Sequence, residues 1–229
     1  MAASIAHEIR NPLTSLKGFT ELLKLNADDE SRMYLSVIDS ELQRMEQILS
    51  ELLVLSKPTT MKVELLELDH IVKQVIEFML PDALMKNIMI QYISPSNQIY
   101  IGGNENRLKQ VLMNLIKNAM ESMNNGGTIT VEMATNDCAI VELMIKDEGV
   151  GMDSTTLQNL FQPFYTTKST GTGLGLAFVK KVIEEHDGVI GVNSELQKGT
   201  CFHLQFPIYT FNQLDTLEVS SKDSAYLVT

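Results

Sequence analysis

The chain has 229 residues, enough for one large domain or two smaller ones, and 44% of them are hydrophobic, as in an ordinary protein with a packed core. The 18 basic and 29 acidic residues give a net charge of −11, which argues against a nucleic-acid surface or an anionic membrane surface as the partner. No apolar run approaches the roughly 20 residues that span a bilayer, nothing resembles a signal peptide, and the cysteines are isolated, so a reduced, cytoplasmic chain is expected.

The first 25 residues are predicted to form a helix. Its apolar residues recur at helical spacing: Ile5, Ile9, Leu13 and Leu16. His7 lies off this stripe and is expected to face water, with Glu8 beside it and Asn11 four residues on. Pro12 has no N–H, which predicts a bend in the helix. An exposed histidine beside a carboxylate is a candidate nucleophile, but on these residues alone a merely solvated side chain is an equal alternative.

A polar turn at residues 26–31 leads into a second amphipathic helix, which ends at Lys57, before Pro58. Its apolar residues are spaced alternately four and three apart: Ile38, Leu42, Met45, Leu49 and Leu52. The two helices form an antiparallel hairpin that cannot bury both apolar stripes alone. We therefore expect a homodimer in which two hairpins make a four-helix bundle; the alternative is a hairpin packed on its own C-terminal domain.

After this hairpin domain of residues 1–57 and a linker at 58–62, the pattern changes to mixed helix and strand over 63–208, followed by a flexible tail at 209–229. Helices are predicted over 69–86, 107–123, 154–161 and 174–186, and strands over 88–93, 99–101, 128–134, 139–146, 189–194 and 200–206. Asp69 and Asn104 are the expected caps of the first two of these helices, and Pro81 is expected to kink or break the first. The pattern fits helices that cover one face of a mostly antiparallel sheet, an α+β sandwich.

Polar side chains follow one face of the helix predicted over 107–123, where Gln110, Asn114 and Asn118 are four residues apart. A neutral amide oxygen is a suitable magnesium ligand when substrate phosphates provide the remaining coordination. The plainer interpretation of the same stripe is the solvated face of an amphipathic helix.

Asp147 follows an apolar strand and is itself followed by Gly149 and Gly151. A carboxylate at a strand end can accept a hydrogen bond from the amino group of adenine, and glycines let the backbone pass close to a ligand. An ordinary Asp/Gly turn explains the same residues equally well.

A glycine-rich stretch, Gly171-Thr172-Gly173-Leu174-Gly175, opens the helix predicted over 174–186. Such a stretch presents backbone N–H groups and a positive helix end to phosphate, and Lys168 can add a cation. Phe161 and Phe164 are either anchors of a mobile lid or two core aromatics. The last hairpin carries Lys198-Gly199-Thr200, a plain turn when judged alone.

In this order, these pieces resemble the N, G1, F, G2 and G3 boxes of the GHKL (Bergerat-type) ATP-binding fold, an α/β sandwich, and the segment from His7 to Pro12 resembles the phosphoacceptor box of sensor histidine kinases. The resemblance covers roughly residues 1–208 and implies ATP and magnesium as cofactors. The residues that it assigns to the nucleotide are Asn114, Asn118, Asp147, Gly149, Gly151, Lys168, Gly171, Gly173, Leu174, Gly175 and Thr200, with Asn118 as the magnesium ligand.

The resemblance also implies a reaction. His7 would attack the γ-phosphate, Glu8 would hold the other ring nitrogen, and the phosphoryl group would pass to an aspartate of a response-regulator receiver domain docking on the bundle. Asn11 matches a position associated with regulator dephosphorylation, a second activity that the sequence leaves open. A sensory or membrane region normally precedes such a core, so we expect a fragment of a membrane-anchored parent. The sequence does not name the signal, the regulator or any protein inhibitor on the bundle. It also does not decide between cis and trans transfer.

At two places the sequence departs from the pattern of related proteins, and both bear on the class of enzyme. GHKL ATPases have a glutamate four residues before the magnesium asparagine, whereas this chain has Asn114, so the general base for hydrolysis is missing. After Asn118 the chain reads Met120-Glu121-Ser122 where many kinases have Lys-Tyr or Lys-Phe, which favours the sporulation and nitrogen-regulation branches. A catalytically idle docking module and a GHKL ATPase are the alternative hypotheses. His186, at the end of the last helix, is interpreted as structural.

Overall fold

The structure is a computed structural model that describes residues 2–56, 63–95, 97–136, 139–168 and 171–209. The predicted linker at 58–62 and the tail from 210 on lie outside the described residues. Contacts divide the chain into two compact units, residues 1–59 with 162–178, and residues 60–161 with 179–229. Each unit is described by itself.

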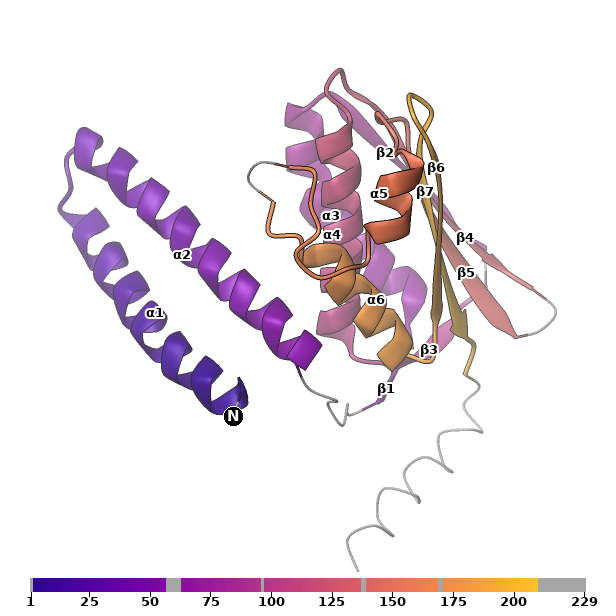
Figure 1. The fold of residues 1–229 in the computed structure, drawn as a ribbon, viewed down its shortest axis with the longest axis horizontal. Coiled ribbons are helices and arrows are strands. Elements are labelled where there is room, and N and C mark those ends of the chain that lie inside the picture. Colours follow the sequence, from indigo (N-terminus) through magenta and orange to yellow (C-terminus); the bar gives the residue numbers. More distant parts are fainter. Residues whose placement is uncertain (1, 57–62, 96, 137–138, 169–170, 210–229) are drawn as a thin grey trace, which may run out of the picture. The chain divides into compact units, whose positions relative to one another are not determined.

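The first unit contains the predicted helical hairpin, formed by α1 (Ala2–Leu25) and α2 (Asp29–Ser56), which run antiparallel (Figure 1). Asp28 ends the turn by accepting a hydrogen bond from the N–H of Ser31 at 2.8 Å, as a helix-capping aspartate does. The helix α1 continues through Pro12 to Leu25. No helix in the described part of the chain has a stretch long and apolar enough to cross a bilayer.

The hairpin leaves much of its apolar surface uncovered. Leu13 and Leu42, from the two predicted stripes, are buried between the helices. Four other stripe residues remain exposed: Leu16 at 53%, Ile38 at 48%, Met45 at 51% and Leu52 at 37% of their surface. One hairpin therefore cannot bury its own stripes, as expected for half of a helical bundle.

The second unit contains two sheets. Its elements are β1 (Glu64–Glu67), α3 (Leu68–Met85), β2 (Ile88–Ile93), β3 (Tyr100–Gly103), α4 (Glu105–Ser122), β4 (Gly127–Thr135), β5 (Ile140–Asp147), α5 (Ser154–Asn159), β6 (Val189–Glu195) and β7 (Gly199–Pro207), while α6 (Gly175–Glu185) begins in the first unit and ends in the second. The larger sheet has the order β2-β4-β5-β7-β6, in which only the β2–β4 pair is parallel. The mostly antiparallel sandwich is thus confirmed, and α3 and α4 lie side by side against one face of the sheet (Figure 1).

Alternate residues of the central strands form the core beneath these helices, because successive side chains in a strand point to opposite faces. In β4, β5 and β7 the buried apolar positions are Ile129, Val131, Met133, Val141, Leu143, Ile145, Phe202, Leu204 and Phe206. From the helix side, α4 contributes Leu108, Val111, Leu112 and Leu115. The polar stripe of α4 lies away from this apolar face, and its position relative to the ends of β5 and β7 determines the site described below.

The structure departs from the local predictions at three places. Asp69 does not cap α3, because the helix starts at Leu68, and the Asp69 carboxylate instead accepts a hydrogen bond from the hydroxyl of Tyr92 at 2.9 Å. Pro81 does not break α3, which runs on to Met85. The strand β1 is missing from the sequence prediction because its four residues are stabilised by pairing with β3, more than 30 residues later.

Candidate functional site

The helix α4, which carries the polar stripe, begins at its predicted cap: the side chain of Asn104 accepts a hydrogen bond from the N–H of Arg107 at 3.1 Å. Asn114 is only 8% exposed, and its amide nitrogen Nδ2 has no partner among the described residues. Asn118 lies one turn later and is half-buried. An amide that is buried without a partner destabilises the free protein, so this stripe is suited to a polar ligand that supplies the missing hydrogen bond. Its amide oxygens also match the oxygen ligands that Mg²⁺ prefers.

The beginning of α4 is fastened to the end of α6 by His186. The Nε2 atom of this buried histidine accepts a hydrogen bond from the backbone N–H of Asn104 at 3.0 Å, and Nδ1 donates to the carbonyl of Val182 at 2.7 Å. Burial lowers the pKa of His186, which favours the neutral ring with one acceptor and one donor nitrogen. Arg107 forms an ion pair with Glu185 beside it. These contacts support the structural interpretation of His186.

Asp147 ends β5 and is 4% exposed. Its Oδ1 atom accepts three hydrogen bonds, from the N–H of Gly149 at 2.8 Å, the N–H of Thr200 at 3.2 Å and the hydroxyl of Ser122 at 3.2 Å. Burial raises the pKa of the Asp147 carboxyl, and the three donors oppose this rise. Within the described residues no donor reaches Oδ2. One carboxyl oxygen is thus held by the protein while the other can accept a hydrogen bond from a ligand.

The turn after Asp147 passes its neighbours so closely that side chains do not fit. A Cβ atom at Gly149 would overlap the hydroxyl of Ser122, and one at Gly151 would overlap the carbonyl oxygen of Glu195. Gly151 also has a φ of +67°, which glycine adopts without steric cost. Close packing within the protein therefore requires glycine at both positions, and the approach of this loop to a ligand stays a prediction.

The hairpin turn at Lys198-Gly199-Thr200 packs against this loop and is more than the plain turn of the sequence analysis. The N–H of Gln197 donates to the carbonyl of Val150 at 2.8 Å, in addition to the bond from Thr200 to Asp147. Ser194 joins the two segments, because its hydroxyl accepts from the N–H of Met152 at 2.9 Å and donates to the carbonyl of Gly199 at 2.9 Å.

The predicted glycine-rich segment belongs to the part of the first unit formed by residues 162–178. The N–H of Phe164 donates to the carbonyl of Gly173 at 2.8 Å, and the N–H of Gly171 donates to the carbonyl of Lys168 at 3.2 Å. These bonds fold the segment back on itself. Phe164 is 66% exposed and is therefore not a core aromatic, while Phe161 is half-buried.

Leu174 is almost completely buried and anchors the end of this segment, where α6 begins at Gly175. Its N–H donates to the hydroxyl of Thr172 at 3.3 Å. The first N–H groups of any α-helix have no partner within the helix, and they carry the positive end of its dipole. This end of α6, with the exposed Lys168 in the same segment, has the chemistry to bind an anionic group.

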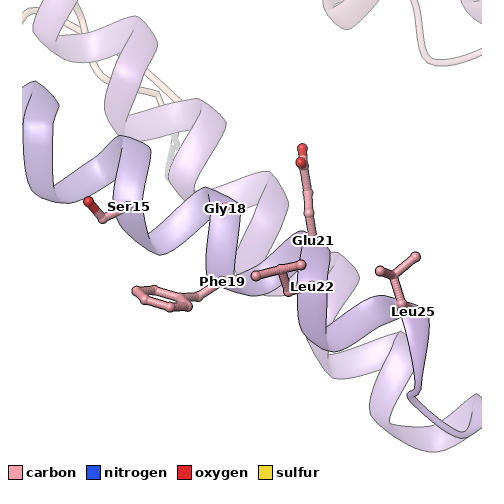
Figure 2. A pocket seen from close by; sticks show the side chains of 6 residues that line it. All are labelled: Ser15, Gly18, Phe19, Glu21, Leu22 and Leu25. Atoms are coloured by element: carbon pink, nitrogen blue, oxygen red, sulfur yellow. The ribbon is translucent and has the colours of Figure 1, made fainter.

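His7, Glu8 and Asn11 lie in the first half of α1. Asn11 is exposed, as expected, whereas the side chains of His7 and Glu8 lie outside the described residues. Further along α1, a shallow hollow of about 580 Å³ opens on the helix surface, and Figure 2 shows Phe19 and Leu22 projecting there. Its lining residues are Ser15, Gly18, Phe19, Glu21, Leu22 and Leu25.

Two residues that contact Asp147 or the loop after it, Ser122 and Ser194, have no role predicted from the sequence. Ser122 extends the polar stripe, since it lies four residues after Asn118, and this spacing could have identified it. Ser194 carries no comparable signal, because it reaches the loop only through the pairing of β6 with β7.

Comparison with protein families gives two matches. The family described as "His Kinase A (phospho-acceptor) domain" matches residues 1–61, and the family described as "Histidine kinase-, DNA gyrase B-, and HSP90-like ATPase" matches residues 103–210. Together the two families account for more than half of the chain, in the order predicted from the motifs.

Individual relatives agree with these families. Sporulation kinase E of Bacillus subtilis is 45% identical over 91% of this chain and 28% of its own length, and sporulation kinase A of the same organism is 46% identical over 90% of this chain and 34% of its own length. The crystal structure of full-length ShkA in complex with AMPPNP superposes with a TM-score of 0.79 at 27% identity, covering 91% of this chain and 46% of that one. The chain therefore spans about a third of the length of these two sporulation kinases.

Proposed function

The chain belongs to the sensor histidine kinase family, and on this basis we propose that it transfers the γ-phosphoryl group of ATP to His7. The observation that carries the proposal is Asp147, whose Oδ1 is held by three donors while Oδ2 can accept from a base. Nucleotide binding is further supported by ShkA, a structural relative in complex with AMPPNP. Residues 1–57 are the proposed phosphoacceptor hairpin, and residues 63–208 are the proposed ATP-binding domain.

In the proposed complex, Asp147 accepts a hydrogen bond from the 6-amino group of adenine, and the loop of Gly149 and Gly151 lies along the nucleotide. Asn118 and Asn114 face the phosphates, and Asn118 would hold magnesium, which neutralises phosphate charge when it is bound. The N–H groups at Gly173 and Gly175 bind phosphate oxygens, while Gly171 keeps the segment folded through the bond from its N–H to the carbonyl of Lys168.

The other proposed nucleotide-site residues act by packing, by charge or through Asp147. The buried Leu174 anchors the phosphate-binding segment, and the exposed Lys168 contributes positive charge. Thr200 acts through Asp147, to which its backbone donates.

The proposed reaction is an in-line displacement at phosphorus. The unprotonated ring nitrogen of His7 forms the N–P bond while the bond from phosphorus to the bridging β–γ oxygen breaks, and ADP leaves. Glu8 accepts a hydrogen bond from the other ring nitrogen and stabilises the positive charge that develops on the ring. The phosphoryl group then passes from His7 to an aspartate carboxylate of a receiver domain docked on the bundle, and Asn11 is the candidate for positioning water in dephosphorylation.

Two partners follow from this proposal. A second copy of the chain would cover the apolar stripe of the hairpin, whose residues Leu16, Ile38 and Met45 are about half exposed. A response-regulator receiver domain would dock near His7 on α1. Attachment to a membrane belongs to a sensor region outside this chain, as the greater length of the relatives allows.

Incubation with γ-labelled ATP and magnesium tests the proposal. We expect the parent chain to acquire label that is acid-labile and alkali-stable, and we expect His7→Gln and Asn118→Ala to abolish it. His70→Gln is the matched control, because His70 is an exposed histidine that lies outside the phosphoacceptor segment.

Other results would indicate the alternatives. Tight ATP binding without any label would indicate the docking module. Phosphate release that survives in His7→Gln would indicate an ATPase.

A further inference from the structure

Ser122 connects the two parts of the candidate nucleotide site. It is the last residue of α4 and lies one helical turn after Asn118, on the same face of the helix. Its hydroxyl oxygen is 3.2 Å from Oδ1 of Asp147 and 2.8 Å from the carbonyl oxygen of Ala119. The side chain therefore extends the polar stripe of α4 to the carboxylate at the end of β5.

The hydroxyl has one proton for these two acceptors. A hydrogen bond to an ionised carboxylate is stronger than one to a neutral carbonyl, so the ionised form of Asp147 attracts the proton. The bond to Ala119 is the common back-bond of a helical serine and needs no further partner. Among the helical serines whose side chains the structure describes, the contact with Asp147 distinguishes Ser122.

Ser122 is joined to the loop after Asp147 by its backbone as well as by its side chain. Its own carbonyl oxygen accepts the N–H of Val150 at 3.1 Å, and the missing side chain of Gly149 provides the space that the hydroxyl occupies. The backbone of Ser122 is thus joined to the loop that follows Asp147, and its side chain is joined to Asp147 itself.

The three donors to Asp147 all bind the same oxygen, Oδ1, and come from three separate segments of the chain. Two of them are the backbone N–H groups of Gly149 and Thr200, which every residue except proline also provides. Ser122 supplies the only one of these three donors that belongs to a side chain.

We propose that Ser122 is a positioning residue for base recognition, whose hydroxyl holds the Asp147 carboxylate with Oδ2 directed to the 6-amino group of a purine and so sets the preference for adenine. The proposal rests on the proposed function, in which Asp147 binds adenine. It assigns to this serine a role that requires no direct contact with the nucleotide.

The test compares two nucleotides that differ only at the recognised group, ATP and purine riboside triphosphate, which lacks the 6-amino group. Dissociation constants are measured by calorimetry for the parent chain, Ser122→Ala and Asp147→Asn. We expect Ser122→Ala to weaken ATP binding about three- to tenfold, the range of one typical hydrogen bond, without changing the affinity for purine riboside triphosphate. Alanine is a better helix former than serine, so α4 should remain intact, as circular dichroism can verify.

Two further variants complete the design. Ser36→Ala is the matched control, because Ser36 makes the same kind of back-bond, to the carbonyl of Met33 at 2.7 Å, on an exposed face of α2. The double variant Ser122→Ala/Asp147→Asn should bind ATP as Asp147→Asn does, since Ser122 acts only through Asp147.

The outcomes separate this inference from the proposed function. If Ser122→Ala weakens both nucleotides equally, or neither, Ser122 has no part in base recognition, although Asp147 can still bind adenine. If the parent binds both nucleotides equally, or Asp147→Asn keeps the preference for ATP, recognition of adenine by Asp147 is itself wrong.

Discussion

At the scale of single residues, Asp147 shows how an ambiguous sequence signal acquires a definite geometry in the structure. An aspartate followed by glycines after a strand is also the composition of an ordinary turn. In the structure, Asp147 is buried and receives donors from Ser122, Gly149 and Thr200, which are far apart in the sequence. An isolated turn would have neither this burial nor these distant donors.

The raised pKa of Asp147 leads to a pH-dependence of ATP binding. As the pH falls through this pKa, the proton is expected on Oδ2, because Oδ1 is occupied by three donors, and a protonated Oδ2 cannot accept from adenine. ATP affinity should therefore decline at a higher pH than the ordinary aspartate value of 3.8 would give. Calorimetric titration of ATP binding across the acid range measures this decline.

Asp147→Asn is the control for this decline, and it also tests how the carboxyl affects folding stability. This variant should bind ATP weakly, and its ATP affinity should not decline over the same pH range. A carboxyl whose pKa is raised in the folded state stabilises the fold increasingly as the pH falls through that raised pKa, and it lowers stability above it. At neutral pH the asparagine variant should therefore resist urea at least as well as the parent, and a clear loss of stability would contradict the account of Asp147.

At the scale of elements, α4 combines the most predictable and the least predictable features. Its length, apolar face and cap follow from the sequence, and the cap at Asn104 is confirmed. Its attachment to α6 through His186 depends on residues 82 positions apart and carries no local signal. The same contrast explains why β1 escapes prediction while β4 and β5, joined by a hairpin, do not.

Asn104→Ala should lower the free energy of unfolding by about 1 kcal/mol, because the side-chain cap to Arg107 is lost. The bond from the Asn104 N–H to His186 is a backbone contact and should survive the change. Urea unfolding followed by circular dichroism measures the effect. Asn104→Ser should retain most of the stability, whereas Asn106→Ala, on the exposed surface of the same helix, should change it little; equal losses in all three variants would contradict a capping role.

At the scale of the whole molecule, the hairpin is incomplete as a single chain. Its helices are joined by ion pairs between Lys17 and Glu46 at 3.4 Å and between Lys24 and Asp39 at 2.8 Å, which lie at the edges of the pair. Partly exposed ion pairs of this kind stabilise little, so the uncovered apolar residues are the main source of free energy for association.

The double variant Ile38→Glu/Met45→Glu should therefore convert the proposed dimer into monomers, because it places charges on two apolar side chains that are 48% and 51% exposed in one chain. Sedimentation equilibrium measures the change in mass. Ser36→Glu/Gln43→Glu is the matched control, since it adds the same charge at two exposed polar positions of α2 with the same spacing. A dimer that survives the first pair of substitutions, or is lost equally with the second, would contradict the proposed interface.

The sequence by itself determined the order of domains, the helical hairpin, the mostly antiparallel sandwich and the family, because periodicity, caps and glycine motifs are local patterns that survive without the fold. Only the tertiary structure decided that Oδ1 of Asp147 is held while Oδ2 can accept, that the turn at Lys198-Gly199-Thr200 packs on the loop of Gly149 and Gly151, and that Ser122 joins α4 to this site. These contacts join segments that lie far apart along the chain, and their geometry depends on how β5, β7 and α4 pack together. No single stretch of sequence contains that information.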